Sequence, residues 1–221
     1  MKKIITTLIL VLSSVVVVHT QEHLQFMGIT FDRTVDEFSK QLMNKGFTLD
    51  DENNQSFQRS HQNKIALNGV FCNYASHVTL FGTGITKTVY SVYVKTLELD
   101  DKGKTANSRE IWEMLKARYL FFKRELLDKY GHPKACVEKI NKQKNIQNPL
   151  INLIEDSYYT LWDTNNGTIK LSVDNDGLLF EPGKHSYSIS LIYLDSSNSS
   201  LMGKEYIELK QKEKARLQND L

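Results

Sequence analysis

The sequence predicts an α+β protein built from two units, each a helix followed by an antiparallel β-meander, with the helices packed on the sheet faces. Two observations lead to this prediction. Helix patterns at residues 34–45 and 108–130 are each followed by short strand-like runs, and turn residues separate those runs. We assign residues 21–100 to the first unit and 105–200 to the second. The highly charged residues 201–221 are expected to form an exposed helix or a frayed tail.

The first helix is predicted from a capping box that is followed by an apolar stripe. Thr34 has the hydroxyl of an N-cap, and Glu37 stands three residues later. Phe38 and Leu42 then fall on one face, and Gly46 supplies the left-handed residue that ends the helix. No side chain of this helix is chemically reactive, so we interpret the segment as scaffold.

The first meander is predicted from strand-like runs between turn residues. The clearest breaks are residues 51–54 and 82–84. The last run, "TVYSVYVKTLEL", is the longest and the richest in β-branched residues. The expected strands are residues 47–49, 56–59, 65–70, 77–81 and 89–97.

The second unit opens with the longer helix pattern "SREIWEMLKARYLFFKRELLDKYG". Asn107 or Ser108 caps this helix and Gly131 ends it. A linker rich in Asn, Lys and Gln is expected over residues 134–148. Beyond it, the runs "YYTLWD", "TIKLSVD" and "SYSISLIYLD" predict strands, and an Asn-Gly dipeptide between the first two is a hairpin signal.

The N-terminus has the order of regions typical of a Sec-type signal peptide. Two lysines precede an apolar run over residues 4–18, and polar residues follow at once. The run is too short for a comfortable membrane span, so we predict cleavage near Thr20–Gln21 and removal of residues 1–20. The mature chain is therefore expected to be exported, either periplasmic or secreted, without stable membrane insertion.

The charge of the mature chain argues against two classes of partner. The full chain has 28 basic and 26 acidic residues, and removal of residues 1–20 takes away two lysines, so formal net charge falls to about zero. A neutral chain offers neither the many phosphate contacts of nucleic-acid binding nor a polybasic anchor for anionic lipid. We therefore expect no nucleic-acid partner.

The chain contains two cysteines, Cys72 and Cys136. Export would place them in an oxidising compartment where two thiols can form a disulfide, and in the alternative both are buried and reduced. The sequence does not show that they come within bonding distance, so both alternatives stay open. Cys72 and His77 can be considered as metal ligands, but no second close pair completes a tetrahedral site, and we expect no metal.

No catalytic motif is recognisable in the sequence. A G-x-S-x-G nucleophile elbow does not occur, and the histidines are scattered. The closest carboxylate cluster, Asp174, Asp176 and Glu181, surrounds a hairpin turn whose chemistry explains the aspartates, and the order of a calcium loop is not kept. We therefore expect a non-catalytic protein without a cofactor.

Tyrosines of the predicted strands are the best candidates for an interaction face. Tyr and Trp anchor many recognition surfaces, but they are also favoured in any half-buried strand, and strand propensity alone predicts the pattern. The candidate face consists of Tyr74, Tyr90, Tyr93, Tyr187 and Tyr193.

Several segments together resemble a group of secreted proteins of unknown function from Bacteroidetes-type bacteria. The resemblance rests on "QEHLQFMGITFDRTVDEFSKQLMNKGF" after the signal peptide, and on "LNGVF", "LLDKYGHP", "GTIKLSV" and "ISLIYLD". These segments cover most of the mature chain, and none has an assigned chemistry. The alternation of helix and meander is also similar to the β-lactamase-inhibitor-like fold, which usually opens each unit with two helices.

Two functions from different classes follow as hypotheses. The first is an exported, non-catalytic module that binds an unknown protein or another macromolecule through the outer face of its sheets. The alternative is a periplasmic or cell-surface hydrolase whose site is assembled from distant residues. A deep pocket with convergent His, Asp, Glu or Ser groups would favour the hydrolase, whereas a broad sheet face with exposed tyrosines favours the binding module.

Overall fold

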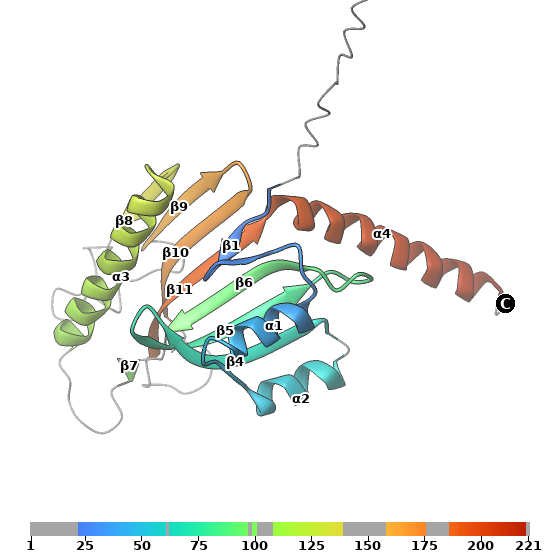
Figure 1. Cartoon of the computed structure of the whole chain (residues 1–221), viewed down its shortest axis with the longest axis horizontal. Coiled ribbons are helices and arrows are strands. Elements are labelled where there is room, and N and C mark those ends of the chain that lie inside the picture. The colour runs from blue at the N-terminus through green and yellow to red at the C-terminus, as the bar shows by residue number, and fades with distance from the viewer. Residues whose placement is uncertain are drawn as a thin grey trace, which may run out of the picture.

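A computed structural model describes residues 22–60, 62–96, 99–100, 108–138, 158–175 and 186–219. Within these ranges the chain forms helices and antiparallel sheets, which confirms the predicted α+β class (Figure 1). The helices are α1 (Val35–Met43), α2 (Asp51–Arg59), α3 (Ser108–Tyr130) and α4 (Ser196–Asn219). None of these described helices combines the length and the apolar character that crossing a membrane requires. The predicted signal peptide lies outside the described residues.

In the described part of the chain, nine strands form one sheet in the order β3-β4-β5-β6-β11-β10-β9-β8, with β7 also paired to β11. All neighbouring strands run antiparallel. A small separate sheet pairs β1 with β2. The strands are β1 (Gln25–Phe26), β2 (Ile29–Thr30), β3 (Thr48–Leu49), β4 (Lys64–Phe71), β5 (Tyr74–Gly82), β6 (Val89–Thr96), β7 (Leu99–Asp100), β8 (Ala135–Glu138), β9 (Tyr158–Thr164), β10 (Gly167–Asn175) and β11 (Ser186–Asp195).

The two predicted units meet in the centre of the large sheet. β6, the last long strand of the first segment, pairs over residues 91–95 with β11, the last strand of the second. Buried apolar residues from both segments belong to one core cluster. The division into units at residues 21–100 and 105–200 therefore stays a prediction, because one sheet and one core include both.

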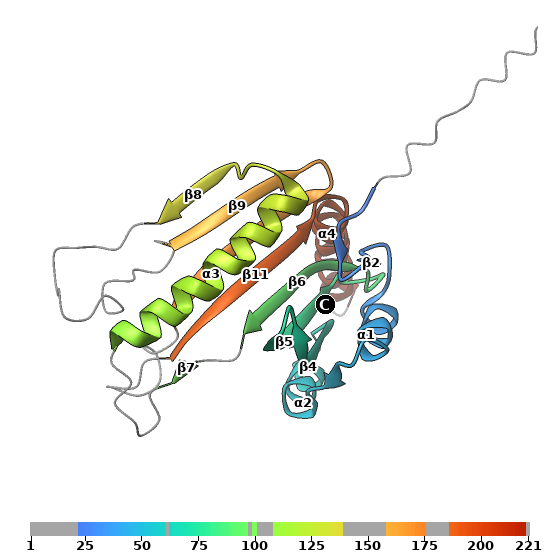
Figure 2. The same cartoon turned by 60° about the vertical axis from the view of Figure 1, so that its left-hand side comes forward.

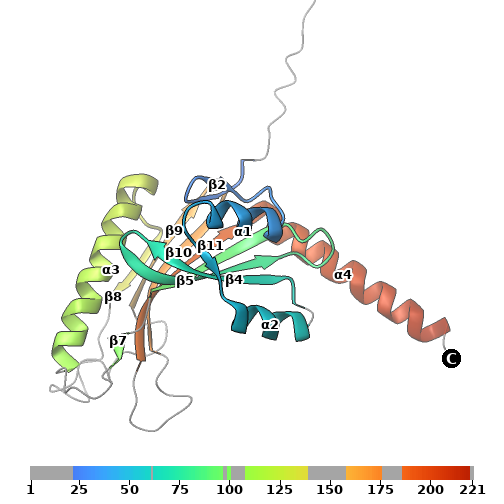
Figure 3. The same cartoon turned by 60° about the horizontal axis from the view of Figure 1, so that its bottom comes forward.

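The helices lie on different sides of the large sheet. α3 crosses β9, β10 and β11 on one face (Figure 2), and its side chains Leu115 and Phe122 are buried there. Leu191 of β11 is buried in the same core, so its neighbour Ile192 points to the opposite face. Figure 3 shows α1 above β4 and β5 and α2 below them.

The first helix begins and ends as predicted. The Glu37 amide donates to the Thr34 hydroxyl at 3.3 Å, and the Thr34 amide donates to the Glu37 carboxylate at 3.1 Å, which confirms the capping box. Phe38 and Leu42 are fully buried in the core. Gly46 has a φ of 93°, in the left-handed region that glycine adopts without strain.

Replacement of the helix cap is expected to have a moderate effect. Thr34→Ala should lower the free energy of unfolding by about 1 kcal/mol, because the Glu37 amide loses its acceptor. Thr34→Ser keeps the hydroxyl and is the matched control. Urea unfolding monitored by circular dichroism measures both variants, and an alanine variant as stable as the serine variant would contradict the role of the cap.

The structure corrects the prediction for residues 51–59, where a turn and a short strand were expected. The segment forms α2, and the carboxylate of Asp50 caps it by accepting from the Asn53 amide at 3.1 Å. The Asn54 side chain accepts from the Ala66 amide at 2.7 Å and donates to the Ala66 carbonyl at 2.9 Å. These contacts attach α2 to the edge of β4, and a short-range sequence pattern does not reveal them.

Two other short elements were not predicted. Residues 135–138, inside the expected linker, form β8 and pair with β9 at the edge of the sheet. The rest of that linker, residues 139–148, lies outside the described residues. The hairpin of β1 and β2 was also missed, because its tight turn places the non-glycine residue Met27 at a φ of 53°.

Buried polar side chains hold the start of α4 against the sheet. Asp195, which is fully buried, accepts hydrogen bonds from the Leu24 amide at 2.8 Å and from the Asn198 amide at 2.9 Å. Asn198 in turn donates to the backbone carbonyls of Phe31 at 2.6 Å and Val89 at 2.8 Å. One helix start thereby connects the N-terminal segment, β6 and β11.

Glu205 forms a second anchor, about two turns further along α4 than Asn198. Its carboxylate accepts from the Ile85 amide at 2.6 Å and from the Thr86 hydroxyl at 2.8 Å. Burial opposes its ionisation, but these hydrogen bonds outweigh burial and lower the pKa of Glu205. Beyond this anchor, residues 206–218 are exposed and α4 projects away from the sheet (Figures 1 and 3), so the expected helix is present.

Candidate functional site

The sheet face opposite α3 carries a row of half-exposed side chains. Cross-strand register places Thr79 beside Tyr93 and Tyr93 beside Ile192. The row continues from Ile192 to Lys170 and from Lys170 to Leu161. Each of these side chains keeps part of its surface in solvent. We call these five residues, Thr79, Tyr93, Ile192, Lys170 and Leu161, the open sheet face.

Hydrogen bonds fix Tyr93 in the middle of this face. Its hydroxyl donates to Asp174 Oδ2 at 3.1 Å. The other carboxylate oxygen of Asp174 accepts from the Ser172 hydroxyl at 3.1 Å, and Ser172 and Ser190 share a hydrogen bond of 2.8 Å. The phenol ring is therefore held in one orientation before any partner arrives.

A second tyrosine lies next to the open sheet face. The ammonium of Lys170 is 5.3 Å from the ring centroid of Tyr159, within the range of a cation–π interaction. Tyr159 opposes Ser172 in the register of β9 and β10. It therefore points to the same side of the sheet as Ser172 and Tyr93. Aromatic rings and a cation with a long apolar stem are thus presented together.

Three of the candidate tyrosines, Tyr93, Tyr90 and Tyr74, are partly exposed. Tyr93 lies on the open sheet face. Tyr90 lies at the end of β6 with its ring 6.3 Å from that of Phe81, and burial raises its pKa. Tyr74 packs beneath α3, where the guanidinium of Arg118 lies 4.6 Å from its ring centroid. Tyr74, which packs against the core, therefore does not share a surface with Tyr93.

The other two candidates, Tyr187 and Tyr193, lie in the core and do not contribute to an exposed face. They are 2% and 5% exposed. Alternate residues of β11 share one face of the sheet, so Tyr187 and Tyr193 point to the same side as Ile189 and Leu191. This side faces α3. The alternation of apolar residues in "SYSISLIYLD" indicates that Tyr187 and Tyr193 face the core. The same alternation places Ile192 on the open sheet face.

Cys72 and Cys136 are free thiols, and both are exposed. Cys72 lies in the turn between β4 and β5, whereas Cys136 lies on β8, and these strands are on opposite sides of α3 (Figure 2). The Cys136 sulfur lies 3.2 Å from Lys123 Nζ and 3.3 Å from the Glu138 carboxylate. The geometry therefore does not support the disulfide, nor the alternative of two buried cysteines.

The remaining titratable side chains considered from the sequence are dispersed. His77 lies 3.7 Å from the carboxylate of Asp50, near the start of α2. Asp174 accepts the hydrogen bond from the Tyr93 hydroxyl, while Asp176 and Glu181 lie outside the described residues. Across the described ranges, no group of three or more His, Cys, Asp or Glu side chains is arranged to hold a metal ion.

Comparison of the chain with protein-family models, curated proteins and solved structures finds no match. The resemblance to secreted Bacteroidetes-type proteins and the similarity to the β-lactamase-inhibitor-like fold therefore stay expectations from the sequence.

Proposed function

We propose that this protein is an exported, non-catalytic module that binds a protein or another macromolecule through the open sheet face. The observation that carries the proposal is the row itself, which crosses five neighbouring strands. At a strand spacing of about 4.8 Å, the row is roughly 19 Å wide. An open surface of this width suits a macromolecule, whereas small molecules bind in concave sites.

The chemistry of the face supports the same proposal. Tyrosine combines a large apolar ring with a polar end, and it is enriched at the centres of protein interfaces. Tyr93 is already oriented by Asp174, so binding costs little further side-chain entropy. Ile192 beside it adds apolar area, and Lys170 on the next strand adds a charge.

Export is the second part of the proposal, and its support comes from the sequence. The order of charged, apolar and polar regions over residues 1–22 is typical of a signal peptide. The resemblance to secreted Bacteroidetes-type proteins points to the same compartment. Intact-mass measurement of the exported protein is expected to give a chain that begins near Gln21, and a mature chain that retains Met1 would contradict this.

The binding function is tested by a charge placed in the centre of the open sheet face. Ile192→Glu should abolish capture of the partner from the envelope fraction and culture medium of the native host, because an unpaired carboxylate would be buried on binding. Val70→Glu is the matched control, since Val70 is an exposed β-branched residue of β4 that lies outside the row of five residues, nearer the turn to β5. Both changes should alter the free energy of unfolding by no more than about 1 kcal/mol.

The readout is the set of proteins and glycans retained by each immobilised variant and identified by mass spectrometry. A species retained by the wild type and by Val70→Glu but lost with Ile192→Glu would support the proposal. Retention of the same species by all three proteins would overturn it, as would the absence of any specifically retained species.

A further inference from the structure

A cavity of about 590 Å³ lies on the other side of the large sheet, between α3, the start of β1 and the turn from β4 to β5. Its walls are mainly apolar and come from four separate parts of the chain. The lining includes Phe71, Cys72, Phe122, Leu126, Leu191 and Tyr193. Sites for small molecules have volumes of roughly 300 to 1,000 Å³ and are mostly apolar.

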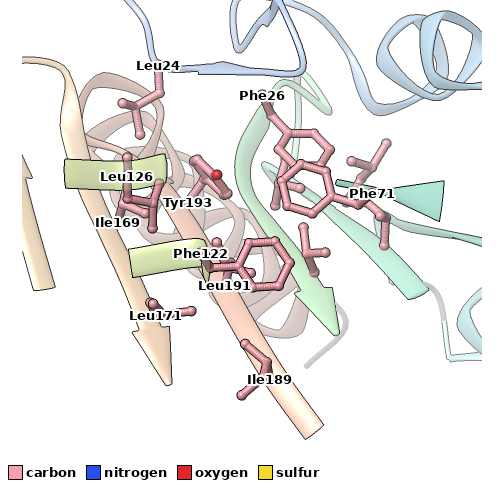
Figure 4. Close-up of a cluster of buried hydrophobic side chains, with 14 of the residues drawn as sticks. Leu24, Phe26, Phe71, Phe122, Leu126, Ile169, Leu171, Ile189, Leu191 and Tyr193 are labelled. Atoms are coloured by element: carbon pink, nitrogen blue, oxygen red, sulfur yellow. The ribbon is translucent and has the colours of Figure 1, made fainter. Parts of the chain in front are cut away.

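Ring packing fixes the shape of this cavity. Phe71 and Phe122 stack with their centroids 5.7 Å apart and an interplanar angle of 7°. Phe26 packs against these rings, with its ring centroid 5.2 Å from that of Phe71 and 5.3 Å from that of Tyr193 (Figure 4). Because these side chains belong to the core cluster, the site is formed before a ligand enters.

Tyr193 provides a polar group in the apolar wall. Only 5% of this residue is exposed, yet it lines the cavity. Burial raises the pKa of Tyr193, and the nearby Tyr130 and Cys72 raise it further, so the phenol is neutral. A neutral phenol can donate or accept a hydrogen bond, so a ligand group that reaches it gains affinity from that bond.

The rim of the cavity selects against negative charge. Glu125 and Asp128 contribute two carboxylates to the lining, and Lys129 contributes one ammonium. An anionic head group would meet a net negative rim, whereas a neutral ligand would not. The apolar walls and the single inner hydroxyl then define what the ligand must present.

We propose that this cavity binds a neutral, largely apolar small molecule that carries one hydrogen-bonding group directed at the hydroxyl of Tyr193. The apolar body of the ligand packs between Phe71, Phe122 and Leu191. This site is separate from the proposed function, because Leu191 and Tyr193 face α3 while the open sheet face lies on the opposite side of the same strands.

The first test is a fluorescence titration with N-phenyl-naphthylamine, a neutral apolar probe with a single N–H group. Saturable binding at one site per chain is expected for the wild type. Glu125→Trp should weaken binding at least tenfold, because the ring closes the cavity mouth. Arg124→Trp is the matched control: Arg124 does not line the cavity, and either change removes the ion pair between Arg124 and Glu125.

Tyr193→Phe tests the hydrogen bond separately. It should lower the affinity for the neutral probe about fivefold, which is the effect of one ordinary hydrogen bond. The anionic probe anilinonaphthalene sulfonate should bind more weakly than the neutral one. Thermal melts establish that each variant is folded. Absence of saturable binding by the wild type, or equal affinities for Glu125→Trp and Arg124→Trp, would overturn the proposal.

A second readout uses the thiol in the cavity wall. In a Cys136→Ser background, Cys72 is the only cysteine, and reaction with a maleimide can be followed by mass spectrometry. Occupancy by the neutral probe should slow this reaction at least fivefold, because Cys72 lines the cavity. An unchanged rate at a saturating probe concentration would place the probe elsewhere and refute the site.

Discussion

Replacement of Asp195 by alanine is expected to lower the free energy of unfolding by about 4 kcal/mol. The carboxylate is fully buried and accepts from the amides of Leu24 and Asn198. Without it, two buried donors lose their acceptor, and each unsatisfied donor costs about 1–3 kcal/mol. The side chain of His23, 3.2 Å from Asp195, loses its partner as well. Urea unfolding of the mature chain measures the change.

Two variants show which contact of Asp195 carries the effect. Asp195→Asn keeps one acceptor oxygen and should lose less stability than the alanine variant. His23→Ala removes only the partly exposed imidazole and should lose about 1 kcal/mol, since both buried amides keep their acceptor. If the alanine and asparagine variants unfold at the same urea concentration as the wild type, the start of α4 does not hold the N-terminal segment in the way described.

Replacement of Phe38 by alanine is the second large effect, with an expected loss of about 3–5 kcal/mol. Phe38 is fully buried on α1, and its ring meets that of Phe31 edge-on, with centroids 5.6 Å apart and planes at 80°. The deletion leaves a cavity between α1 and the sheet that neighbouring residues fill only in part. The aromatic contact with Phe31 is lost as well.

Met43 provides the control on the same helix. Its side chain is 37% exposed, so Met43→Ala should cost less than about 1 kcal/mol. Thermal melts followed by circular dichroism compare the two variants with the wild type. Equal melting temperatures for Phe38→Ala and Met43→Ala would show that α1 is not packed on the sheet through Phe38.

Local patterns were enough to predict the elements that local contacts determine. The capping box of Thr34 and Glu37 lies within one helical turn, so sequence spacing specified the start of α1. The long strands β4, β5 and β6 were found because apolar and β-branched residues persist over their length. The Asn-Gly signal likewise predicted the hairpin that joins β9 to β10.

Elements that depend on distant partners could not be predicted in this way. α2 has a low apolar content, and its attachment depends on the amide of Asn54 meeting the backbone of Ala66. β8 exists as a strand because β9 supplies its hydrogen bonds. Strand propensity identified tyrosines as candidates, but the face of each one is set by register within the whole sheet.

The two sites also differ in how much of them the sequence shows. Tyr93 was a candidate from the start, whereas its neighbours Ile192 and Lys170 join it only through the pairing of β6, β11 and β10. The cavity around Tyr193 is assembled from β1, the turn after β4, α3 and β11. A sequence pattern within one segment does not show that these four distant segments come into contact.

The pairing of β6 with β11 also affects the timing of folding. Val94 and Leu191 are register partners although about one hundred residues separate them along the chain. While the chain is being synthesised, β6 lacks its neighbour until β11 and the start of α4 have emerged, so the core is completed last. For a protein that is exported as proposed, this late closure keeps the core incomplete for most of synthesis, and an incompletely folded chain passes more readily through a narrow translocation channel.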